Sequence, residues 1–124
     1  MIRLRSFILL LFLLTACSPS IPANTGLAGT VTLGPVCPVV QVNHPCPDQS
    51  YQATLTILTS TGKQVKQFTT DADGKFQIPL APGDYILHPE TPENQPMPFA
   101  QEQPFSVVAG QFTQIEVVYD SGIR

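Results

Sequence analysis

Two cysteines and a histidine lie close together in the first half of the chain, at Cys37, His44 and Cys46. Thiolate and imidazole groups are suitable ligands for zinc and copper, and a fourth ligand could come from Asp48 or His88. The spacing of the cysteines does not match a zinc knuckle. The same two cysteines could instead form a disulfide, which would add roughly 2–3 kcal/mol to the stability of a small domain.

The N-terminus favours the disulfide over the metal site. Basic residues at Arg3 and Arg5 precede an apolar run over residues 7–14, and small residues follow it. That order is typical of a secretory signal, and the apolar run is too short to span a bilayer as a permanent helix. Exported compartments are often oxidising, so we expect Cys37 and Cys46 to be joined.

The residues that end this signal, Leu14-Thr15-Ala16-Cys17, resemble the lipobox of bacterial lipoproteins. The resemblance implies lipid attachment to the Cys17 thiol, cleavage before Cys17 and acylation of the new amino group. Two or more acyl chains anchor a protein stably, so an extracytoplasmic protein attached to the cell membrane or the outer membrane is expected. The expected divisions are a signal peptide (1–16), a lipidated tether (17–25), a domain (26–120) and a C-terminal tail (121–124).

The charge of the chain limits its partners. Six Lys and Arg stand against nine Asp and Glu, and removal of Arg3 and Arg5 with the signal leaves four against nine, a net charge of about −5. Such a surface argues against nucleic acid and anionic lipid head groups as partners. The expected partners are the membrane, through the lipid, and a protein or glycan of the cell envelope.

Apolar and polar residues alternate in short segments between turn residues, which predicts strands. No segment after the signal has a helical period of useful length, so an all-β sandwich or small barrel is expected. The seven predicted strands cover 27–33, 51–58, 64–70, 75–80, 85–88, 105–108 and 112–119. The predicted core residues are Val31, Leu55, Ile57, Phe76, Ile78, Leu80, Tyr85, Leu87, Ile115 and Val117.

Two blocks of the chain carry a recognisable pattern. The first block is Gly29-x-Val31-x-x-Gly34-Pro35-x-Cys37-Pro38-Val39, Pro45-Cys46-Pro47-Asp48 and Tyr51-x-Ala53; the second is Thr70-Asp71-x-Asp73-Gly74-x-Phe76 and Leu80-x-Pro82-Gly83-x-Tyr85-x-Leu87-x-Pro89. The second block resembles the carboxypeptidase regulatory-like and Cna-B-like domains, and the first is similar to a cysteine-bearing variant found in small secreted bacterial proteins. The resemblance implies a seven-stranded prealbumin-like (transthyretin-like, Ig-like) β-sandwich that is an accessory or binding module without catalysis or cofactor.

The sequence lacks the usual signatures of catalysis. No serine stands in a nucleophile elbow, and no glycine-rich phosphate loop occurs. Asp71, Asp73 and Gly74 resemble the start of a calcium loop, but the later acidic ligands are missing, so a hairpin turn is favoured. The first predicted strand has no lysine and the last has no asparagine, so the isopeptide bond of some Cna-B domains is not expected.

Two long connections, over residues 34–50 and 89–103, are the expected binding loops. If successive strands reverse direction, both lie at one end of the sandwich with the turn over 70–74, and the tether joins the opposite end. The candidate binding residues are His44, Asp48, Glu90, Glu93 and Glu102. The sequence thus predicts a lipid-anchored, non-catalytic envelope module, and the alternative is a copper- or zinc-handling lipoprotein that uses Cys37, His44 and Cys46.

Overall fold

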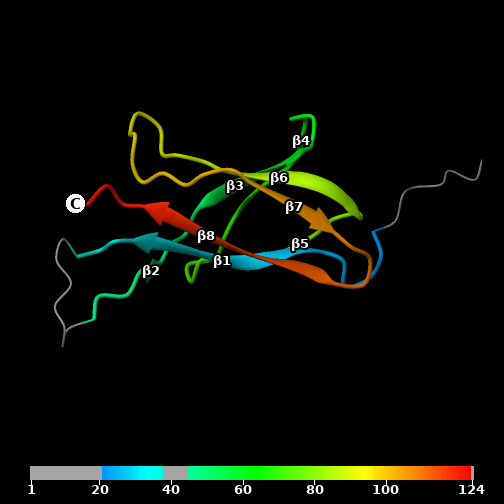
Figure 1. The fold of residues 1–124 in the computed structure, drawn as a ribbon, viewed down its shortest axis with the longest axis horizontal. Coiled ribbons are helices and arrows are strands. Elements are labelled where there is room, and N and C mark those ends of the chain that lie inside the picture. Colours follow the sequence, from blue (N-terminus) through cyan, green and yellow to red (C-terminus); the bar gives the residue numbers. More distant parts are fainter. Residues whose placement is uncertain (1–20, 38–44, 124) are drawn as a thin grey trace, which may run out of the picture.

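The computed structural model describes residues 21–37 and 45–123, and within these ranges the protein contains β-strands and no helix. Two sheets lie face to face in a sandwich-like arrangement (Figure 1). The all-β prediction is therefore confirmed. The strands are β1 (Gly26–Gly34), β2 (Gln49–Ser50), β3 (Thr54–Thr59), β4 (Gln64–Thr69), β5 (Lys75–Pro79), β6 (Gly83–Pro89), β7 (Gln103–Val107) and β8 (Phe112–Asp120).

One sheet is built around β1, which pairs with β8 on one side and with β2 and β5 on the other. The β1–β8 pairing is parallel and runs from Gly26↔Phe112 to Gly34↔Asp120. The second sheet has the order β4-β3-β6-β7, and its strands are all antiparallel. As a result, β8 and β7 are edge strands on the same side of the molecule, where a few contacts join them.

The strand prediction is wrong in number and in several boundaries: β3 begins three residues later than expected, and β6 and β7 each begin two residues earlier. The described residues form eight strands, because the short β2 pairs with Thr32 and Leu33 of β1 at the end of the first long connection. Residues 51–53, expected in a strand, cross between the sheets instead. The Tyr51 N–H donates to the Val31 carbonyl in one sheet (3.1 Å), and the Ala53 N–H donates to the Thr70 hydroxyl beside the other (3.0 Å).

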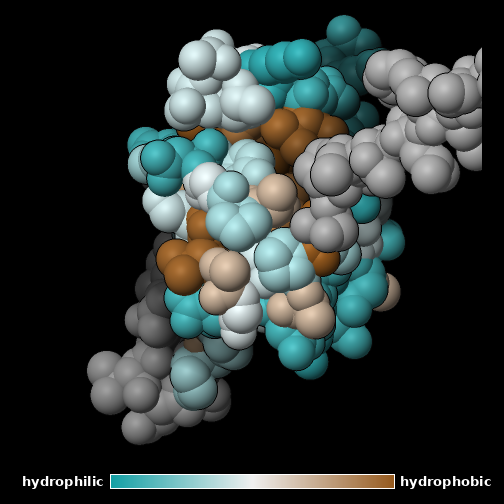
Figure 2. Space-filling view, turned by 90° about the vertical axis from the view of Figure 1, so that its right-hand side faces the viewer, coloured by the Kyte–Doolittle hydropathy of each residue, from teal (hydrophilic) through white to brown (hydrophobic). Residues whose placement is uncertain are grey.

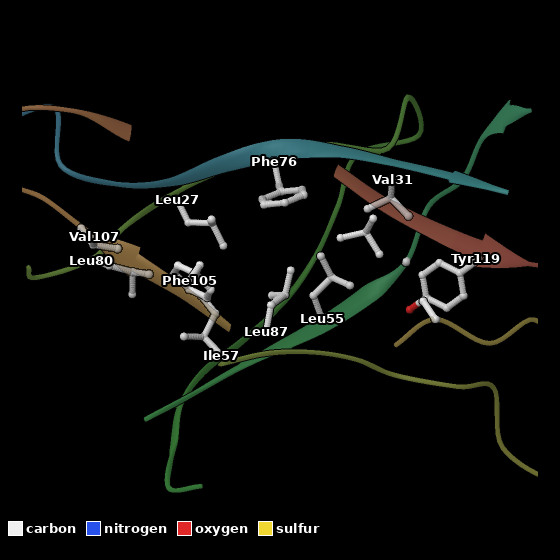
Figure 3. Packing of buried hydrophobic residues seen from close by; sticks show 13 residues of the cluster. Leu27, Val31, Leu55, Ile57, Phe76, Leu80, Leu87, Phe105, Val107 and Tyr119 are labelled. Atoms are coloured by element: carbon white, nitrogen blue, oxygen red, sulfur yellow. The ribbon is translucent and has the colours of Figure 1, made fainter. Parts of the chain in front are cut away.

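The core fills the space between the two sheets (Figure 3). Seven of the ten predicted core residues are buried there. Ile78, Tyr85 and Ile115 are only partly buried and pack against the core from its margin. Six buried residues were not in the predicted core: Leu27, Ala53, Ala100, Phe105, Val107 and Tyr119.

Candidate functional site

The connection between β1 and β2 and the connection between β6 and β7 meet where β8 ends. Phe99 in the second connection exchanges two backbone hydrogen bonds with Asp120, with N–O distances of 3.0 and 2.7 Å. The Ser121 N–H then donates to the carbonyl of Gly34, at the start of the first connection (3.0 Å). We call this part of the molecule the loop end. The prediction that the long connections lie together is confirmed.

The chain enters β1 at the opposite end of the sandwich (Figure 1). There the Gly26 N–H donates to the Gln111 carbonyl (3.3 Å), and the Gly110 N–H donates to the Thr25 hydroxyl (2.9 Å). Figure 2 looks onto this end and shows hydrophobic surface between hydrophilic side chains. Val108, in the turn between β7 and β8, is 55 % exposed. Gly26, the first residue after the expected tether, is thus separated from the loop end by the length of β1.

Cys37 and Cys46 form a disulfide with a Cα–Cα distance of 6.2 Å, which confirms that prediction. Because the two sulfurs are bonded to each other, neither is a thiolate that could bind zinc or copper. The third residue of the alternative metal site, His44, lies outside the described residues. No group of three His, Cys, Asp or Glu side chains in residues 21–37 and 45–123 is placed to hold a metal ion. Cys17, the predicted lipidation site, also lies outside these ranges.

The turn between β4 and β5 uses its carboxylate internally. One oxygen of Asp71 accepts the N–H groups of Asp73 (2.9 Å) and Lys75 (2.8 Å). The Gly74 N–H donates to the Asp71 carbonyl (3.0 Å), and the Gly74 carbonyl accepts from the Val31 N–H (2.7 Å). This carboxylate therefore caps a hairpin turn, and the turn is held against β1.

A polar network covers the outer face of the β4-β3-β6 sheet near the loop end. Thr56 is only 3 % exposed. Its hydroxyl donates to the Glu90 carboxylate (2.6 Å) and accepts from the Gln67 amide (3.1 Å). The Nδ1 of His88 lies 2.7 Å from Glu102, and its Nε2 lies 3.8 Å from Glu90. Glu90 and Glu102 are the first and last acidic residues of the second long connection, so His88 links the two ends of that connection.

The predicted binding residues do not form one site. Glu90 and Glu102 meet at His88, but Glu93 lies with Glu90 in a different hollow of about 300 Å³ beside residues 51–54. Asp48 lies against the Gly34 backbone, where a side chain on Gly34 would collide with its carboxylate. The two long connections attach to different sheets, so Asp48 lies beside β1 whereas Glu90 follows β6.

Tyr119 ties the core to the second long connection. It is fully buried, its ring lies 4.9 Å from that of Tyr51, and its hydroxyl donates to the Glu90 carbonyl (2.8 Å). Burial raises the pKa of Tyr119 far above its ordinary value, and the nearby Tyr51 and Glu90 raise it further. The hydroxyl therefore remains a donor and holds the start of the connection over the core.

A groove of about 390 Å³ opens at the loop end between the second connection and the outer side of β8. We call it the β8 groove. Phe99 and Val118, two of its apolar side chains, are 46 % and 47 % exposed. The alternation that makes Ile115 and Val117 predicted core residues places Val118 outward, and an outward valine was the available signal for this surface. The groove is lined by Phe99, Ala100, Gln101, Glu102, Gln103, Glu116, Val118 and Asp120.

The chain matches no protein-family model, and a search of curated proteins finds no significant match. The described residues include no helix that is long and apolar enough to cross a membrane. Inferences about function therefore depend on the sequence patterns and on the geometry of the loop end.

Proposed function

We propose that this chain is a lipid-anchored accessory protein of a bacterial cell envelope, in which a non-catalytic β-sandwich presents its loop end to a protein or glycan partner. The observation that carries the proposal is the arrangement of the two ends. The chain enters β1 at one end, and the described parts of both long connections lie at the other. A lipid on Cys17 would therefore leave the loop end facing away from the membrane.

The sequence motif supports the anchor, and the surface supports its orientation. Leu14-Thr15-Ala16-Cys17 follows a basic and then an apolar segment, which is the order of a lipoprotein signal. Exposed apolar side chains at the β1 entrance, Ile21 (44 %) and Val108 (55 %), suit a position near a lipid surface.

The disulfide and the hydrogen bonds of the loop end support a binding role. Binding surfaces are commonly carried by loops that a rigid scaffold holds in place. Here the first connection is closed by the Cys37–Cys46 bond, and the second is fixed by Tyr119 at its start and by the Phe99–Asp120 pair near its end. A prealbumin-like sandwich, in which the seven predicted strands correspond to β1 and β3–β8, is part of the proposal.

The test is the intact mass of the protein recovered from its native envelope, with and without reductant and alkylating agent. We expect a chain that begins at Cys17 and carries acyl groups, with Cys37 and Cys46 alkylated only after reduction. Its matched control is Cys17→Ser, which we expect to remain unprocessed and without acyl groups. A wild-type chain that leaves the envelope without lipid would contradict the anchor. Thiols that are alkylated without reductant would revive the metal-handling alternative.

A further inference from the structure

We propose that the β8 groove binds a short, extended, cationic segment of a protein partner. The inference rests on the proposed binding role of the loop end and names the class of its partner. Three observations on described residues support it: an interrupted strand pairing, exposed apolar side chains and a one-sided distribution of lysines.

The backbone pairing beside β8 stops where the groove begins. Phe99 and Asp120 form an isolated antiparallel bridge. Continued pairing would place Gln101 opposite Val118, but the connection diverges there to join β7. Because backbone groups on one edge recur every second residue, Val118 presents its N–H and C=O on the same edge as Asp120. An extended segment that enters the groove could use these groups as an added strand does.

The seam between β7 and β8 limits how long the bound segment can be. The amide of Gln103 donates to the Glu116 carbonyl across the gap (2.9 Å). Farther along, the Thr113 hydroxyl donates to the Ser106 carbonyl (2.6 Å). Side chains therefore close the seam beyond Glu116, and at about 3.3 Å per residue the open part accommodates a segment of only a few residues.

The apolar side chains of the groove are half exposed at its open end. Phe99 and Val118 are 46 % and 47 % exposed. The neighbouring Met97 is 37 % exposed and lies beside Gly122, where a Cβ built on the glycine would come within 3.1 Å of the Met97 Cγ. Large apolar side chains that cluster beside open backbone groups are typical of an interaction surface. They favour a partner segment that carries at least one apolar residue between its charged ones.

The lysines of the described residues lie on the side of the domain away from the groove. Glu102 and Glu116 line the groove, whereas Lys63, Lys66 and Lys75 lie at or beside β4 and β5, at the opposite edges of the two sheets. A segment with lysine or arginine would therefore meet carboxylates and no lysine at the groove. This complementarity favours a cationic protein segment over an anionic envelope polymer.

The test measures the binding of defined peptides to the full chain by fluorescence anisotropy. The probe is a labelled, end-capped peptide of the sequence Lys-Val-Lys-Val-Lys, and its control is Glu-Val-Glu-Val-Glu. We expect the basic peptide to bind and the acidic peptide not to bind. Glu116→Gln and Val118→Ser should each weaken binding by about three- to tenfold, since each removes one exposed contact. Glu93→Gln, which removes the same charge at the loop end outside the groove, should leave binding unchanged.

Several results would overturn the proposal. They are the absence of binding, equal binding of the acidic peptide, equal effects of Glu116→Gln and Glu93→Gln, and an unaffected Val118→Ser variant. If the chain alone forms oligomers that Lys66→Gln disperses, a second copy is the occupant and the proposal of a foreign segment is wrong. Peptide binding and acylation of Cys17 are measured separately, so failure of the groove can be distinguished from failure of the anchor.

Discussion

Substitution of Gly74 by alanine tests how the turn between β4 and β5 is held against β1. Gly74 has φ = +73°, and a Cβ built there would collide with the Val31 carbonyl oxygen and lie 3.0 Å from the Tyr51 carbonyl oxygen. Both obstacles are backbone atoms, so no side chain can rotate away. The Val31 carbonyl also accepts the Tyr51 N–H (3.1 Å), so a shift there would disturb the chain that crosses between the sheets.

The matched control is Gly62→Ala, because Gly62 is also a turn glycine with a positive φ but has room for a Cβ. Its φ is +92°, its N–H donates to the Thr59 carbonyl (2.9 Å), and no atom lies within 4 Å of a Cβ built on it. A left-handed φ costs a non-glycine residue about 1 kcal/mol, and a clash in a packed site adds about 1–3 kcal/mol. We therefore expect Gly62→Ala to lower the free energy of unfolding by about 1 kcal/mol and Gly74→Ala by about 2–4 kcal/mol.

The assay is equilibrium unfolding in urea, followed by circular dichroism under non-reducing conditions so that the disulfide stays intact. The change in unfolded-chain entropy from glycine to alanine is the same for both variants and cancels in their difference. Equal losses for Gly74→Ala and Gly62→Ala would refute the reasoning, because the φ angle alone would then account for both. A smaller loss for Gly74→Ala would refute the close approach of this turn to β1.

Three further predictions concern groups that hold the loop end. Tyr119→Phe should lower the free energy of unfolding by about 1–1.5 kcal/mol, because it removes a buried hydrogen-bond donor. Its control, Tyr85→Phe, removes an exposed hydrogen bond to the Ala81 carbonyl and should lower the free energy of unfolding by less than about 0.5 kcal/mol in the same urea assay. Equal losses for the two variants would contradict this prediction. Because burial raises the pKa of Tyr119, the folded state keeps the phenol proton above about pH 10, where the unfolded state loses it. The free energy of unfolding should therefore fall by about 1.4 kcal/mol for each pH unit above pH 10. Tyr119→Phe should remove this part of the alkaline slope, and an unchanged slope in urea titrations above pH 10 would count against it. Replacement of Cys37 and Cys46 by serine should lower the free energy of unfolding by roughly 2–3 kcal/mol through the loss of a short-loop cross-link, and an unchanged urea midpoint would show that the bond is not formed in solution.

The strands and most of the core were predictable because alternation is a local property. In β5, Phe76 is buried between exposed neighbours, as its period-two pattern requires. The turns were predictable for the same reason, since Asp71 and Gly74 supply within four residues a side-chain acceptor and a left-handed φ. The extra strand β2 was not, because its two residues are exposed and pair only with a distant part of β1.

The proposed binding surface was only partly predictable, since it joins segments that are far apart in the sequence. The sequence identified the second long connection and its carboxylates. In the structure, however, Glu90 accepts a hydrogen bond from Thr56 in the polar network, and Glu93 lines a hollow that is separate from the β8 groove. The β8 groove requires Phe99 to lie beside Asp120, and no local pattern specifies that contact. Likewise, alternation with the core residues Leu55 and Ile57 places Thr56 on the outer face of its sheet, and it is buried there because Glu90 and Gln67 cover it.

By itself, the sequence determined most strand positions, the turns and the acidic composition, and it favoured a disulfide between Cys37 and Cys46. Each of these follows from the order and spacing of residues along the chain. Only the tertiary structure decided that β8 lies parallel to β1, that the two long connections meet at its end, and that Phe99 and Val118 share a groove. These contacts depend on how two sheets pack to bury one common core, which is a property of the whole chain rather than of any segment in it.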